Sequence, residues 1–279
     1  MIRLAVRVHR RQAELVLAQL LELAPSGVEE VDVNPEVVEY AVYGAPGELP
    51  QVPALRAAAG GAYVDIRTEE IADDWSERWR SFHRPLQIGG RLTVRPPWEP
   101  PGETELDVVI DPGQAFGTGA HATTRLCLEL MLDAADRRGD GGGSLVDVGC
   151  GSGVLAIVAA KLGFAPVTAL DLDRAAIAAT SENAARNGVT VETRLLDMRH
   201  EQVPGADLVV ANVLAPPLIA WAGAQRTLAP ALILSGLLAG EADRVAEAFG
   251  AHGVRELERR ESGEWAALML ARASDSLPM

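Results

Sequence analysis

The sequence has little of several features that mark specialised classes of protein. Only two of its 279 residues are cysteines, Cys127 and Cys150, and they form no CxxC pair, so neither a disulfide framework nor a cysteine zinc site is expected. No run of about 18 apolar residues is present, which argues against a membrane-spanning helix. The first residues alternate like a strand around Arg3 and Arg7 and do not resemble a signal peptide. We therefore expect a cytoplasmic protein without a bound metal.

Basic residues are also in the minority. The sequence has 25 Lys and Arg against 39 Asp and Glu, a formal net charge of −14. Such a surface repels phosphate backbones and attracts a basic protein segment. RNA-binding sheets need exposed aromatic residues, for which Tyr40 and Tyr43 are a poor match. We expect no direct binding of nucleic acid and no association with a membrane.

The length and the 48% share of hydrophobic residues fit one large domain and one small one. Residues 1–68 predict the order strand, helix, strand, strand, helix, strand, which is typical of a small α+β ferredoxin-like domain. Residues 69–86 are predicted to form a linker helix, in which Trp75 and Trp79 lie four residues apart and share one face.

Residues 87–279 predict an α/β domain. From residue 123 to residue 249 the apolar patterns alternate between helix and strand, which predicts a doubly wound, Rossmann-like sheet with helices on both faces. The segments 254–261 and 265–271 are predicted to form a closing antiparallel hairpin.

The run DVGCGSGVLAI at Asp147–Ile157 carries most of the functional information. A buried strand enters a glycine-rich turn containing Gly149 and Gly151, and a helix follows, so the turn can receive a ligand at the end of the helix dipole. The next strand ends at Asp171, where a carboxylate can accept hydrogen bonds from both hydroxyls of a ribose. This pattern suits a nicotinamide cofactor as well as S-adenosylmethionine.

Other candidate residues lie beside this pattern. The stretch DPGQAFGTGAHATT, residues 111–124, precedes the first cofactor strand and can fold over a ligand; it contains His121, a possible base, and Thr124, a possible helix cap or cofactor contact. Asn212 ends a strand at the carboxyl edge, where it can orient an amine or bind cofactor, and Asp197 is placed to meet an adenine amino group.

These residues resemble the bacterial methyltransferases that modify large-subunit ribosomal protein eleven. The resemblance covers nearly the whole chain and rests on Asp74-Trp75, Pro96-Pro97-Trp98-Glu99, DPGQAFGTGAHATT, DVGCGSGVLAI, ALDLD, VVANVLAPPL, LILSGLL and Gly263-Glu264-Trp265. It implies a class I methyltransferase domain that uses S-adenosylmethionine, and an N-terminal domain that recognises the ribosomal protein. It also implies methylation of lysine side chains and of the N-terminal amine. Matched by motif, the cofactor residues are Thr124, Gly149, Asp171 and Asn212; Gly151 of the glycine turn joins them, and Asn212 is the one catalytic candidate.

Alternatives remain open at this point. The chain could be a related protein-lysine methyltransferase with a different protein target. The GxGxxA pattern and Asp171 also fit a nicotinamide-dependent oxidoreductase. A non-catalytic module that binds S-adenosylmethionine or remodels RNA is a third possibility.

Overall fold

The computed structural model describes residues 2–23, 28–44, 49–50, 52–70, 84–111, 121–139 and 142–272. Two compact units can be recognised in it, and each is described by itself. Most of the predicted linker helix, with Trp75 and Trp79, lies outside the described residues, as does the segment 112–120.

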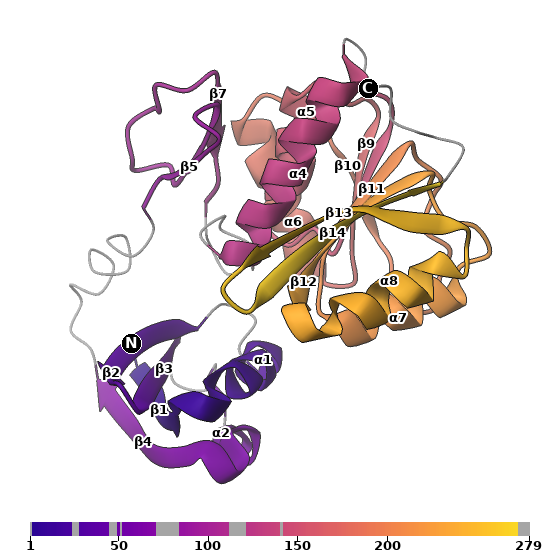
Figure 1. The fold of residues 1–279 in the computed structure, drawn as a ribbon. Coiled ribbons are helices and arrows are strands. Elements are labelled where there is room, and N and C mark those ends of the chain that lie inside the picture. Colours follow the sequence, from indigo (N-terminus) through magenta and orange to yellow (C-terminus); the bar gives the residue numbers. More distant parts are fainter. Residues whose placement is uncertain are drawn as a thin grey trace. The chain divides into compact units, whose positions relative to one another are not determined.

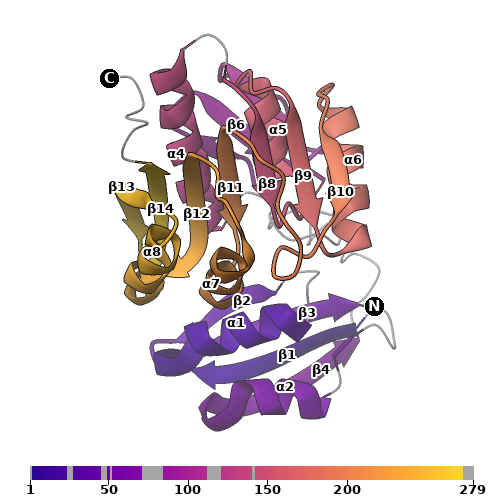
Figure 2. The same cartoon turned by 90° about the vertical axis from the view of Figure 1, so that its right-hand side faces the viewer.

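The first unit is a four-stranded antiparallel sheet with two helices (Figure 2). Its elements are β1 (Ile2–His9), α1 (Ala13–Leu23), β2 (Glu29–Asn34), β3 (Val37–Gly44), α2 (Val52–Ala59) and β4 (Tyr63–Glu70). The strand order β2-β3-β1-β4 confirms the predicted ferredoxin-like arrangement. Side chains alternate between the two faces of β1, and those of Leu4, Val6 and Val8 all join the apolar core formed with α1 and α2. This alternation explains why the helices cover one face of the sheet. β4 continues to Glu70, two residues past the boundary expected at residue 68.

The second unit is built on a seven-stranded sheet of order β10-β9-β8-β11-β12-β14-β13 (Figure 1). Its strands are β8 (Leu145–Val148), β9 (Val167–Asp171), β10 (Glu192–Leu195), β11 (Leu208–Asn212), β12 (Ala231–Leu238), β13 (Val254–Ser262) and β14 (Trp265–Arg272). The strands β8 to β12 pair with one another in parallel, whereas β14 pairs antiparallel with both β12 and β13. The predicted doubly wound sheet and closing hairpin are therefore confirmed.

Helices cover both faces of this sheet (Figure 1). On one side lie α4 (Ala122–Arg138), α5 (Val154–Lys161) and α6 (Arg174–Arg186), and on the other α7 (Ala215–Ala224) and α8 (Ala242–Gly250). All four residues of β8 are buried, as expected for a central parallel strand covered on both faces. A small sheet of β5 (Leu86–Ile88), β6 (Leu92–Arg95) and β7 (Leu106–Val109) adds its apolar residues to the core of α4 and α5. Among the described residues, no helix is long and apolar enough to cross a membrane.

Candidate functional site

The strand order places a ligand site between β8 and β11. From β8 the chain adds β9 and then β10 toward one edge of the sheet, and from β11 it adds β12 toward the other edge. The direction in which strands are added therefore reverses between β8 and β11. In open parallel sheets, ligands bind outside the carboxyl ends of the strands at such a reversal. Gly149 follows β8 and Asn212 ends β11, so two of the predicted residues lie at this position.

The glycine turn is packed closely against the protein itself. Gly149 has a φ of 76°, and a Cβ added there would lie 2.6 Å from Cγ2 of Val213. The backbone N–H groups of Gly149 and Cys150 donate to the carbonyl of Leu170, at 2.8 and 3.0 Å, which fastens the turn to β9. Gly149 is thus needed for packing against the segment after β11, a requirement that the sequence alone did not reveal.

Asp171 ends β9 and holds the same turn. Its Oδ2 accepts a hydrogen bond from the N–H of Gly151 at 3.0 Å, and its Oδ1 accepts one from the N–H of Asp173 at 2.9 Å. A carboxylate has about four acceptor positions, so both oxygens keep capacity for further donors. Leu172, the next residue, is 62% exposed, and Leu195 opposite Asp171 in β10 is 48% exposed. An acceptor for hydroxyl groups therefore lies beside exposed apolar surface.

Asn212 and Thr124 are brought together from 88 positions apart. The Nδ2 of Asn212 donates to Oγ1 of Thr124 at 3.0 Å, and in this orientation of the carboxamide Oδ1 is its acceptor. Thr124 has no exposed surface, whereas Asn212 is half-buried at the strand end. The structure therefore places Thr124 behind Asn212, and a direct contact between Thr124 and the cofactor stays a prediction.

Two weaker candidates have other partners. His121 precedes α4, where its Nδ1 accepts the N–H of Thr123 at 3.4 Å and its ring packs edge-on against Trp265 with centroids 4.8 Å apart. Burial lowers the pKa of His121, so the imidazole is neutral and serves as a helix cap. The carboxylate of Asp197 binds Arg199 in a bidentate pair at 2.8 and 2.9 Å, and this pair lowers the pKa of Asp197 to about 2.

Asp147 lies in β8 two residues before Gly149, and the sequence motifs did not single it out. Its carboxyl group is fully buried, and Oδ2 accepts the N–H of Ala156 in the first turn of α5 at 3.0 Å. Oδ1 has no hydrogen-bond partner among the described residues. Burial raises the pKa of Asp147 to about 7. The only indication in the sequence is a lone acidic residue inside the apolar strand LVDV.

Gly236 and Ser235 were also missed. Gly236 has a φ of 83°, and a Cβ there would lie 2.7 Å from the backbone of Val213, so the glycine allows β12 to approach the end of β11. The buried hydroxyl of Ser235 lies within hydrogen-bond distance of the carbonyls of Thr123 and Ala266, at 3.1 and 3.2 Å, and shares its single proton between them. A glycine inside the strand LILSGLL was the available indication.

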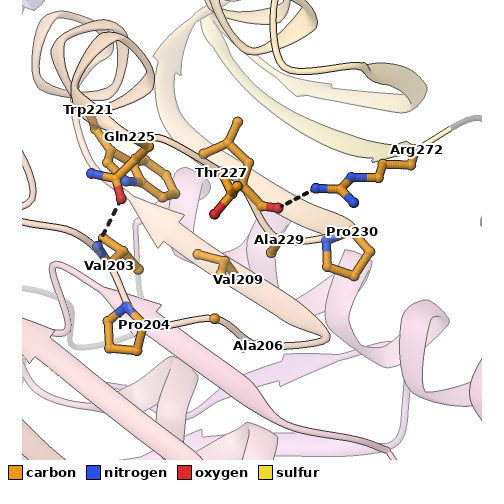
Figure 3. Close-up of a pocket in the computed structure, with 12 residues that line it drawn as sticks. Val203, Pro204, Ala206, Val209, Trp221, Gln225, Thr227, Ala229, Pro230 and Arg272 are labelled. Carbon is orange, nitrogen blue, oxygen red and sulfur yellow. Dashed lines mark hydrogen bonds between the residues drawn. The ribbon is translucent and has the colours of Figure 1, made fainter.

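A hollow of about 260 Å³ lies at the opposite edge of the sheet, where β11 and β12 begin (Figure 3). Trp221 lines it, Gln225 accepts the N–H of Val203 at 2.8 Å, and Arg272 donates to the carbonyl of Leu228 at 2.9 Å (Figure 3). None of the predicted site residues lines this hollow, and we place the functional site at the carboxyl edge on topological grounds.

The fold and the carboxyl edge together define a class of enzyme. A dinucleotide-binding sheet has the order 3-2-1-4-5-6, whereas here an antiparallel strand, β14, is inserted between β12 and β13. With a glycine turn after the first strand of the sheet and a carboxylate after the second, this is a class I methyltransferase, whose cofactor is S-adenosylmethionine.

Comparison with known proteins gives the family. The family described as ribosomal protein L11 methyltransferase (PrmA) matches residues 2–273. A ribosomal protein L11 methyltransferase of Pelotomaculum thermopropionicum is 42% identical over 228 residues, which cover 79% of this chain and 72% of that protein. One of Geotalea uraniireducens is 40% identical over 211 residues, covering 70% of this chain and 67% of that protein. The crystal structure of a ribosomal protein L11 methylase from Lactobacillus delbrueckii subsp. bulgaricus is 28% identical, with a TM-score of 0.59, and covers 68% of this chain and 99% of that one.

The chain therefore belongs to the ribosomal protein L11 methyltransferase family. This confirms the resemblance, the enzyme class and the cofactor predicted from the sequence. It also decides the cofactor that the glycine turn left open, against the nicotinamide alternative.

Proposed function

We propose that this enzyme methylates ribosomal protein L11, at lysine side chains and at the N-terminal amine. The observation that carries the proposal is the family match over residues 2–273, together with relatives whose names state this substrate. The formal net charge of −14 supports a basic protein as the partner. A ribosomal substrate favours a cytoplasmic location. We assign recognition of the substrate to residues 1–68, the link to residues 69–86, and methyl transfer to residues 87–279.

For the cofactor we propose the residues matched by motif: Thr124, Gly149, Gly151, Asp171 and Asn212. The acceptors at the end of β9 fit the hydroxyl groups of a ribose, because both oxygens of Asp171 retain acceptor capacity while backbone N–H groups hold the carboxylate in place. The exposed side chain of Leu172 offers an apolar surface for a flat adenine ring. When bound, S-adenosylmethionine supplies a methyl group that is already activated on a sulfonium.

Asn212 is proposed to orient the amine. Its Oδ1 is the acceptor left after Nδ2 has bonded to Thr124, and an amine N–H is the matching donor. The amine must be neutral to react, and a lysine with a pKa of about 10.4 or an α-amine near 7.7–8.0 loses its proton more readily once water is excluded. No side chain is assigned as a base: the amine gives its proton to water as it enters the site, and the enzyme then aligns the neutral nitrogen with the methyl group.

Methyl transfer to purified L11 tests this proposal. The full chain is incubated with L11 and S-adenosylmethionine carrying a labelled methyl group, and the modified residues are located by mass spectrometry. We expect label on lysines and on the N-terminal amine, and none with a second basic ribosomal protein as the control. Label on another protein of a ribosomal extract, with L11 unmodified, would instead favour the alternative of a different protein target.

A further inference from the structure

One face of α6, extended by its C-cap residue Asn187, carries three polar residues at intervals of three and four: Thr180, Asn183 and Asn187. Such spacing aligns side chains along one side of a helix. Thr180 and Asn183 are buried, at 0% and 2% exposure. Buried polar groups need hydrogen-bond partners, and most partners of these three are backbone groups of two segments that lie far apart in the sequence.

The first segment is the end of β7 and the residues that follow it, from Val109 to Asp111. The N–H of Val109 donates to Oδ1 of Asn187 at 2.9 Å, and the N–H of Asp111 donates to Oδ1 of Asn183 at 3.0 Å. Nδ2 of Asn187 also donates to the carbonyl of Val109 at 2.6 Å. Residues four apart on a helix rise by about 6.0 Å, and residues two apart on a strand by about 6.7 Å. Two asparagines one turn apart therefore match alternate peptide groups and take the place of a neighbouring strand.

The second segment is the glycine turn. Nδ2 of Asn183 donates to the carbonyl of Ser152 at 2.9 Å, and Oγ1 of Thr180 donates to the carbonyl of Gly151 at 3.1 Å. In a planar trans peptide, the N–H lies opposite the C=O. Holding the carbonyls of Gly151 and Ser152 toward α6 therefore turns the N–H groups of the two following residues away from it.

We propose that Asn183 is a positioning residue that fixes the glycine turn and the backbone at Asp111 to each other, and so sets the affinity for S-adenosylmethionine. Of the three side chains, it alone bonds to both segments: Thr180 holds only the turn, and Asn187 holds only Val109 and its own helix. The proposal rests on the assignment of the cofactor to this turn.

Three alanine or valine variants of the full chain separate the roles. Each is measured by calorimetry for its affinity for S-adenosylmethionine and by its midpoint of thermal unfolding. For Asn183→Ala we expect at least about 10-fold weaker binding, because a buried carbonyl of the turn loses its donor. Thr180→Val, which keeps the volume and removes the hydroxyl, should weaken binding similarly.

Asn187→Ala is the matched control. It removes two hydrogen bonds to Val109 and should lower the unfolding midpoint about as much as Asn183→Ala, while binding of S-adenosylmethionine stays within about 2-fold of the wild type. The Asn183→Asp variant tests the two contacts of Asn183 separately. It keeps an oxygen that can accept the N–H of Asp111, and it loses the N–H that donates to the carbonyl of Ser152. It should therefore bind as weakly as Asn183→Ala.

Equal losses of affinity in the Asn183→Ala and Asn187→Ala variants, or losses that follow the unfolding midpoint, would overturn the inference. So would unchanged affinity in Asn183→Ala. Wild-type protein that binds S-adenosylmethionine but leaves L11 unmodified would overturn only the proposed substrate. Wild-type protein that fails to bind S-adenosylmethionine would overturn both.

Discussion

Replacing Asp147 by asparagine should change how the stability of the enzyme depends on pH. The carboxyl group of Asp147 is fully buried under the glycine turn, where burial, with a smaller contribution from the nearby charge of Asp171, raises its pKa to about 7. An unfolded aspartate has a pKa of about 3.9. Between these two values the folded chain holds a proton that the unfolded chain has lost.

The sign of the effect follows from this difference in proton binding. Stability falls with increasing pH wherever the folded state binds more protons. The contribution of Asp147 is therefore full below about pH 4, declines as the pH rises, and is lost once the pH passes about 7. Between pH 5 and pH 8 the folded chain holds the extra proton over about two pH units, at about 1.4 kcal/mol each, so the wild type should lose about 3 kcal/mol relative to Asp147→Asn. The variant keeps an acceptor for the N–H of Ala156, which limits its other effects.

Urea unfolding at pH 5 and pH 8 measures this difference. Tryptophan fluorescence is a suitable probe, because the five tryptophans lie between residues 75 and 265 and none belongs to the first sheet. Other carboxylates with lowered pKa values, such as Asp107 and Asp207, act equally in both proteins and cancel in the comparison. A difference between wild type and variant that is the same at pH 5 and pH 8 would refute the assignment of a neutral Asp147.

Three further substitutions test the proposed site. Asp171→Ala should weaken binding of S-adenosylmethionine about 100-fold in calorimetry, because two hydrogen bonds to a charged acceptor are lost; unchanged affinity would exclude its role at the ribose. Asn212→Ala should lower kcat about 100-fold and affinity for the cofactor much less, since it orients the amine; equal losses would make it a cofactor residue only. Gly149→Ala should weaken cofactor binding and lower the unfolding midpoint, because the new Cβ lies 2.6 Å from Cγ2 of Val213 at a φ of 76°. Val213→Ala should recover part of this loss, and no recovery would contradict the steric explanation.

The sequence predicted well those features that depend on neighbouring residues. Alternation in β1 and continuous burial in β8 follow from local periodicity, and so do the turn at Gly149 and the carboxylate at the end of β9. The motifs were sufficient to identify the family, and the match over residues 2–273 confirmed it. The predicted fold of segment 112–120 over a ligand and most of the predicted linker helix stay predictions, because residues 112–120 and 71–83 lie outside the described residues.

What the sequence by itself determined was the order of elements, the strand ends that carry Asp171 and Asn212, and the class of chemistry. Only the tertiary structure decided that Thr124 holds Asn212, that His121 caps a helix, and that Asp147 is buried beneath the turn. The physical reason is that hydrogen-bond partners and desolvation are set by groups that folding brings together from distant positions. Periodicity specifies which face of a strand is buried, but not which polar atom it meets there.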